Sequence, residues 1–230
     1  MAKAQGQATR AFFLLVLAGA GLLAAPGAAM AQSSPMTFRL ASVEGRGCAA
    51  RCPRVIVAEG AIAEDTPQAF VGFLSSVADS PGLRDVVVIN SPGGRVVASM
   101  RLGAALRKLG AAVIVARFAD DGGRNFAMAG QCMSACVYAL MGGVKRVVPP
   151  ESRVGIHRMS SQETGAQGRS RGPGAPSYAS HEMVDALADY AAQMGVNPTV
   201  IRVAERIAPE EIHIVSPAEL QRWRLASSKF

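Results

Sequence analysis

Between residues 54 and 116 the sequence alternates short β-branched segments with longer segments of helical period, and this order constrains the fold more than any other feature. The predicted strands cover residues 54–58, 86–90 and 111–116, and the predicted helices start at Thr66 and cover residues 95–109. Strands joined through helices in this way pair in parallel with right-handed crossovers. The chain is therefore expected to form an α/β domain.

The flanking segments extend this pattern. A leading strand is expected at residues 37–43, and two further strands at residues 146–148 and 153–157. The polar, glycine-bearing segment 117–131 is interpreted as a loop, and the Ser/Gly/Gln/Arg-rich segment 158–178 as a flexible excursion. After it, helices are expected at 180–194 and 199–207, a strand at 212–215, and a last helix opened by the capping box Ser216–Glu219. No internal repeat is found.

The first 31 residues have the pattern of a secretory signal. Lys3 and Arg10 precede an apolar run at residues 11–25, and Ala29-Met30-Ala31 offers a small-residue cleavage site. The apolar run is shorter than the ~20 residues of a membrane-spanning helix. We therefore predict a signal peptide over residues 1–31, a single domain over residues 32–230, and a periplasmic or secreted protein. An uncleaved signal anchor is the alternative, and it would be the chain's only attachment to a membrane.

Charge and composition argue against nucleic acid as a binding partner. The net charge is +7, and losing Lys3 and Arg10 with the signal, which contains no acidic residue, lowers it to +5. The basic residues are scattered and aromatics make up only 5% of the chain, so nothing resembles the charged stacking surface of a nucleic-acid-binding protein. No nucleic-acid partner is predicted, and no motif specifies a cofactor.

The four cysteines form two Cys-x-x-x-Cys pairs, Cys48/Cys52 and Cys132/Cys136. In an exported protein an even number of cysteines favours disulfides. Three connectivities are possible, and we favour the two local ones because Cys52 begins a strand while Cys132 follows the far ends of the strands, too distant for a bond. Cys132 must then precede the helix proper. Without clustered histidines a zinc site is not favoured, and no metal is predicted.

Three short segments carry groups suited to nucleophilic catalysis. Gly93 and Gly94 follow a strand and open a helix, where bare glycines would let a carbonyl approach backbone N–H groups. Ser134 lies among small residues at a helix start, and His157 ends a strand. Taken singly, these features also fit a plain turn, an N-cap serine and a structural histidine. Their combination favours a serine hydrolase.

These segments together resemble the Clp protease proteolytic subunit, within the Clp–crotonase superfamily. Ile89-Asn90-Ser91-Pro92-Gly93-Gly94 is similar to that family's oxyanion turn, Gly130-x-x-x-Ser134 to its nucleophile segment, and Pro150-x-Ser152-Arg153-Val154-x-Ile156-His157 to its base segment. The resemblance covers residues 54–225. Within the family, the chain resembles exported Clp-like proteins with a Cys-x-Ser-Ala-Cys segment.

The resemblance implies a crotonase-like fold of stacked strand–strand–helix units and a role for each matched residue. Ser134 would be the nucleophile, His157 its general base, and the N–H groups of Gly94 and Ala135 the oxyanion hole. The family's acidic third member falls at Ala204 in this chain. Glu205, one residue away, is taken as the candidate replacement, with Glu210 and Glu211 further along.

The predicted function is an exported serine hydrolase, a peptidase that cleaves peptide or protein substrates through an acyl-enzyme. The alternative is a non-catalytic periplasmic binding or assembly protein that keeps the fold and the cleft. The resemblance implies a homo-oligomer, and no ATPase partner is expected outside the cytoplasm. Other polar candidates are interpreted as structural or solvated groups: His181, His213, Lys145, Asp120, Asp121 and Arg124.

Overall fold

The computed structural model describes residues 1, 34–43, 52–121, 124–161 and 177–227. The predicted signal segment, Cys48 and most of the excursion after His157 lie outside this part, so those predictions remain predictions. The strands are β1 (Thr37–Ser42), β2 (Arg54–Glu59), β3 (Leu83–Asn90), β4 (Ala112–Asp121), β5 (Arg124–Ala129), β6 (Gln131–Met133), β7 (Lys145–Val147), β8 (Arg153–Ile156), β9 (Ser160–Ser161), β10 (Ser177–Tyr178) and β11 (His213–Ile214). The helices are α1 (Thr66–Val77), α2 (Val96–Leu109), α3 (Cys136–Gly142), α4 (His181–Gln193), α5 (Thr199–Ala204) and α6 (Pro217–Arg222).

The main sheet has the parallel centre that the sequence predicts. Strands β2, β3, β4 and β7 pair in parallel in that order, and β1 joins the free edge of β2 in the antiparallel direction. Side chains alternate between its faces: Ile56 and Ile89 pack toward the helices, whereas Val57 and Val88 belong to a smaller cluster on the other face. Both faces are apolar, which explains the unbroken β-branched runs in these strands.

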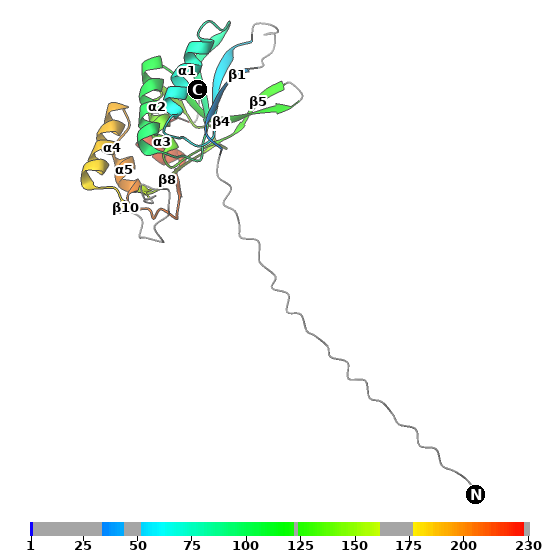
Figure 1. Ribbon diagram of the computed structural model, residues 1–230. Helices are drawn as coiled ribbons and strands as arrows, with labels where there is room; N and C mark the ends of the chain where they lie inside the picture. Colours follow the sequence, from blue (N-terminus) through cyan, green and yellow to red (C-terminus); the bar gives the residue numbers. More distant parts are fainter. Residues whose placement is uncertain (2–33, 44–51, 122–123, 162–176, 228–230) are drawn as a thin grey trace. The chain divides into compact units, whose positions relative to one another are not determined.

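The segment predicted as a loop at residues 117–131 is instead mostly a hairpin, and that prediction is wrong. Strand β4 continues to Asp121 and β5 returns from Arg124, with Ala116 paired to Ala129 at the base. Phe118 is only 9% exposed and packs in the smaller cluster, so tertiary burial stabilises an extension that the surrounding charges did not suggest. In Figure 1 the hairpin projects away from the helices.

A second, three-stranded sheet carries the candidate site. Strand β8 lies between β6, which it pairs in parallel, and β11, which it pairs in the antiparallel direction. A bridge between Ser91 and Cys132 joins this sheet to the end of β3. Strands β9 and β10 form a separate short pair.

Helices α1, α2 and α3 cover one face of the main sheet, and α4 and α5 lie beyond α2 and α3 (Figure 1). The core between these layers is continuous, and Phe70, Leu102 and Leu140 within it are fully buried. Helices α2 and α3 approach closely because Gly103 and Gly142 meet at the contact, where a side chain on either residue would overlap the other helix.

Arg146 joins the ends of several elements from inside this layer. Its guanidinium donates to the carbonyls of Met141 and Gly143 at the end of α3, of Met194 at the end of α4, and of Arg224 and Leu225 near the C-terminus, at 2.8–3.2 Å. A cation is favourable at the carbonyl end of a helix. Burial, followed by the nearby Arg107 and Arg224, lowers the pKa of Arg146 from its usual value. None of the helices in the described residues is long and apolar enough to span a bilayer.

Candidate functional site

Ser134 and His157 are brought together by the pairing of two short strands. Ser134 follows β6 directly and His157 follows β8, and these strands run in parallel with Met133 opposite Gly155. The Ser134 Oγ lies 2.7 Å from Nε2 of His157, a short hydrogen bond. A hydroxyl beside an imidazole in this geometry can lose its proton to the ring as it attacks an electrophile.

The backbone of Ser134 adopts an uncommon conformation. Its φ of 54° lies in the left-handed region, which costs a non-glycine residue roughly 1 kcal/mol or more. The turn is stabilised by its own N–H, which donates to the Gly155 carbonyl at 2.8 Å, and by its carbonyl, which accepts from the Val137 N–H at 3.1 Å. The sharp turn between β6 and α3 leaves Ser134 half-buried and lining a pocket.

Gly93 and Gly94 form the turn after β3 and lie against the Ser134 segment. Their φ values are 108° and 141°, a region that favours glycine. A Cβ on Gly93 would stand 2.7 Å from the carbonyl oxygen of Met133, and one on Gly94 would overlap the backbone of Ile62. Ser91 fixes the turn by accepting the Gly93 N–H at 3.1 Å. Both glycines are therefore required by local packing.

Two backbone donors at this site have no acceptor among the residues that the structure describes. Within the described residues, neither the Gly94 N–H nor the Ala135 N–H makes a hydrogen bond, although the neighbouring Gly93 and Arg95 N–H groups do. Gly94 and Ala135 line the same pocket as Ser134 and His157. Free donors beside a nucleophile can stabilise negative charge that develops on a substrate oxygen.

The other nitrogen of His157 has no partner in the described part of the chain. Its Nδ1 is buried and makes no hydrogen bond to the described residues. Glu205, the predicted third member, instead accepts from the Arg158 side chain at 3.4 Å and from the Met159 N–H at 3.3 Å. Glu205 therefore does not hold His157 in this structure, because its carboxylate is already bonded to the segment that follows the histidine. Ala204, which lines the pocket with His157, has no polar group to offer.

A small pocket opens beside the serine and continues into a wider groove. The pocket has a volume of about 70 Å³, and its apolar wall is made by Val137, Tyr138, Met141, Val200, Ile201 and Ala204. Burial, and to a lesser degree Glu205, raises the pKa of Tyr138, which keeps its phenol neutral. The groove, of about 620 Å³, shares Gly94, Val96, Met159 and Ser160 with the pocket. The exposed apolar side chains of Val97, Tyr178 and Met183 also line it.

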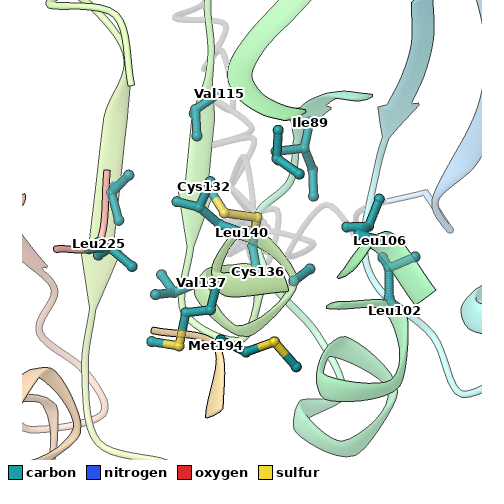
Figure 2. Close-up of a cluster of buried hydrophobic side chains, with 14 of the residues drawn as sticks. Ile89, Leu102, Leu106, Val115, Cys132, Cys136, Val137, Leu140, Met194 and Leu225 are labelled. Atoms are coloured by element: carbon teal, nitrogen blue, oxygen red, sulfur yellow. A yellow bond between two sulfur atoms is a disulfide. The ribbon is translucent and has the colours of Figure 1, made fainter. Parts of the chain in front are cut away.

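The predicted disulfide between Cys132 and Cys136 is present and brackets Ser134. The two Cα atoms are 5.2 Å apart, and both residues are fully buried. Cys132 lies in β6 and Cys136 is the first residue of α3, so Cys132 does precede the helix. Figure 2 shows the bridge within the buried cluster, near Val115, Ile89 and Leu140. Cys48 lies outside the described residues, so its pairing with Cys52 stays a prediction.

The remaining candidates from the sequence lie apart from this pocket. His213 pairs with Glu219 at 3.0 Å, and His181 is exposed at the first position of α4. Lys145 is exposed at the start of β7, and Asp120, Asp121 and Arg124 belong to the hairpin. In the described part of the chain, no group of three or more His, Cys, Asp or Glu residues is placed to hold a metal.

Sequence reasoning missed most of the pocket wall. Val137, Tyr138 and Met141 share one side of α3 at helical spacing, and that spacing could have identified them once Ser134 was chosen. Met159 and Ser160 fall in the segment interpreted as a flexible excursion. No sequence signal marked them.

Comparison with known proteins establishes the fold. No protein-family model matches the chain, and no curated protein matches it. A mutant of the 1510-N membrane-bound stomatin-specific protease, with a serine replaced by alanine, superposes with a TM-score of 0.50 and 16% identity, over 76% of this chain and 78% of the other. A second mutant, with a lysine replaced by alanine and a bound substrate peptide, gives 0.48 and 17%, over 76% and 74%. The first likeness, with the mainly parallel sheet, confirms the Clp protease/crotonase-like α/β fold.

Proposed function

We propose that the chain is a serine peptidase that acts through an acyl-enzyme on Ser134, with His157 as general base. The observation that carries the proposal is the 2.7 Å contact between Ser134 Oγ and His157 Nε2, on a strained turn that faces a pocket. Strain in the backbone of a nucleophile persists only where the surrounding structure enforces it, and such residues cluster at active sites.

In the proposed reaction, Nε2 of His157 accepts the hydroxyl proton as Ser134 Oγ attacks the carbonyl carbon of the substrate. The oxyanion of the tetrahedral intermediate would accept from the N–H groups of Gly94 and Ala135, which have no other acceptor in the described residues. The imidazolium then gives its proton to the leaving amine, and an acyl-enzyme remains. Water, deprotonated by the same nitrogen, attacks the ester carbonyl and releases the acid.

Two further observations favour a peptide as the substrate. The pocket beside Ser134 is small and has one apolar wall, which suits one side chain, and the groove that continues from it offers room for an extended chain. In addition, the solved structure with a TM-score of 0.50 is that of a protease.

Labelling with a fluorophosphonate probe tests the proposal. The folded protein should label, and Ser134→Ala and His157→Ala should each abolish labelling. Ser75→Ala and His181→Ala, which change exposed residues on α1 and α4, are the matched controls and should label as the wild type does. Labelled wild type would then be offered peptides with apolar residues before the scissile bond. Absence of labelling in a folded, disulfide-bonded protein would refute the proposal.

A non-catalytic binding or assembly protein is the second candidate, and the unpaired Nδ1 of His157 is the observation that favours it. Loss of the carboxylate that orients the histidine can cost a serine protease on the order of 10⁴ in kcat. A protein that retained the groove for binding alone would not need that carboxylate. Under this candidate, the probe would label neither the wild type nor any variant, and peptides would still bind.

We also propose that the protein is exported to the periplasm or beyond and assembles with copies of itself. The leader pattern and the Cys132–Cys136 disulfide favour an oxidising compartment. Mass spectrometry of protein from an exporting host should give an N-terminus after Ala31. Light scattering of the mature protein would give the number of copies, and a single copy would contradict the second part.

A further inference from the structure

The left-handed backbone conformation of Ser134 is unfavourable and must be stabilised by the surrounding structure. A disulfide bond spans the residues on either side of the serine. Cys132 lies two residues before the serine and Cys136 two residues after it, so their disulfide closes a small ring with Ser134 at its centre. The backbone hydrogen bonds of Ser134 each constrain one peptide group of the turn. The bridge ties both arms of the turn together.

Both ends of the bridge are anchored in structure that cannot easily move. Cys132 pairs with Val154 in β8 and bridges to Ser91, and Cys136 opens α3. Both residues are fully buried, and the bridge packs among core side chains (Figure 2). Because Ser134 lies on the pocket side of this ring, the position of its hydroxyl depends on the distance between the two arms.

We propose that the Cys132–Cys136 disulfide is a positioning element that holds Ser134 in line with His157, so that the chain without the bridge folds but reacts slowly. The inference rests on the proposed function. The bond fixes the separation of the two arms of the turn within a closely packed region. Two thiols must stand further apart than two bonded sulfur atoms, and two alanine side chains leave the arms untied, so either change lets the arms move. A displacement of the order of 1 Å in a reacting group can lower a rate about 100-fold.

The alternative role, general stabilisation of the fold, is less well supported by the geometry. A disulfide restricts the unfolded chain more when it closes a longer loop, and this one spans a separation of only four residues. Free cysteines are also well accommodated in an apolar core. The reduced chain therefore keeps most of its packing, and the principal change is local to the serine.

The test separates reactivity from folding. The Cys132→Ala/Cys136→Ala double variant and the wild type are treated with a fluorophosphonate probe at several concentrations, well below both melting temperatures, to obtain kinact and KI. We expect kinact to fall about 100-fold with KI almost unchanged. The matched control is Leu187→Ala, which removes a fully buried side chain on α4 away from the pocket and keeps the bridge. It should lower the melting temperature and leave kinact at the wild-type value.

A second measurement covers a double variant that fails to fold. Wild-type protein and a Cys48→Ala/Cys52→Ala variant, which keeps only Cys132 and Cys136, are reduced with dithiothreitol. The reagent gives two electrons and two protons to each disulfide, forms two thiols and becomes a cyclic disulfide itself, and the same loss of kinact in both proteins assigns the effect to the Cys132–Cys136 bridge. The circular dichroism spectrum should persist while kinact falls, and reoxidation should restore it.

A wild-type kinact in the double variant, or unfolding of the reduced wild type, would overturn the positioning role. A similar fall of kinact in Leu187→Ala would overturn it as well. If the oxidised wild type does not label at all, it is the proposed peptidase function that fails.

Discussion

Replacing glycine by alanine should have opposite effects on the stability of the protein at two helical positions. One lies at the close contact between α2 and α3, and the other lies on the exposed side of α1. Gly142 ends α3, and a Cβ built on it would stand 2.5 Å from the carbonyl carbon of Gly103 and overlap that residue's oxygen and Cα. Gly72 lies in α1, is exposed, and has nothing within 4 Å of the position of its Cβ. Each change to alanine adds one methyl group to a helix. The methyl group at position 142 would meet the backbone of α2, and the one at position 72 would meet solvent.

The expected free energies follow from these distances. Ordinary contact begins at 3.4 Å, so relief of the 2.5 Å contact alone would require α2 and α3 to part by about 0.9 Å, and the closer oxygen and Cα of Gly103 require more. Overpacking of a core costs about 1–3 kcal/mol, and backbone on both sides favours the upper end. Gly72→Ala should stabilise the protein by about 0.5–1 kcal/mol because alanine loses less backbone entropy in a helix. For a domain of this size 1 kcal/mol corresponds to about 2–4 °C.

Thermal and urea unfolding of the mature protein measure both changes. Gly142→Ala should melt about 6–12 °C below the wild type, taking about 3 kcal/mol at that conversion, and Gly72→Ala about 1–4 °C above it. Because α3 begins two residues after Ser134, Gly142→Ala should also slow labelling by the fluorophosphonate probe. Equal shifts for the two variants would refute the reasoning, since the helix propensity of alanine would then outweigh the packing that the structure shows.

Three further predictions concern other parts of the molecule. Ala204→Asp adds a carboxylate to the pocket that His157 also lines, where it can accept a hydrogen bond from Nδ1, which has no partner among the described residues. It should raise the labelling rate by about tenfold or more, whereas Ala204→Asn should not; equal rates would contradict this. Arg146→Met removes five charge-assisted hydrogen bonds and should lower the free energy of unfolding in urea by at least about 3 kcal/mol, with a loss below 1 kcal/mol counting against it. Burial opposes ionisation of Glu219, but hydrogen bonds from Ser216 and His213 outweigh it and lower its pKa below 4.5. Its contribution should be complete above pH 4.5 and disappear as the pH falls through the lowered value, so the stability of Glu219→Gln measured by urea unfolding should depend less on pH in that range.

Much of the fold was predictable because local pattern and global topology agree. The apolar runs of β2, β3 and β4, separated by amphipathic helices, allow few arrangements other than parallel strands under a helical layer. The β4–β5 hairpin was not predicted from the sequence. Its alternating apolar pattern is short, and it is interrupted by Asp120, Asp121 and two glycines, which are residues typical of a loop. Burial of Phe118 against the far face of the sheet, together with pairing to β5, favours the strand there.

Some features of the candidate site could likewise be predicted from the sequence, and others could not. Ser134 and His157 could be predicted because each follows directly from a strand, and the parallel pairing of β6 with β8 brings the two strand ends together. The backbone conformation of Ser134 could not, since the left-handed region is uncommon for serine and depends on contacts with Gly93 and Gly155. The partner of Glu205 was equally hidden, because a helix position one residue from the expected one points to a different neighbour.

The guanidinium of Arg146 also has a consequence for the order in which the chain can assemble. Two of its five acceptors, the carbonyls of Arg224 and Leu225, lie 78 and 79 residues further along the sequence. As the chain emerges from the ribosome, N-terminal end first, the α3 segment and Arg146 are synthesised well before those acceptors. The guanidinium of Arg146 therefore stays charged and partly hydrated until residues 224 and 225 have been synthesised and have folded against it. The hydrogen bonds that join the end of α3 to Arg224 and Leu225 are therefore completed only after the chain has been extended by almost 80 residues beyond Arg146.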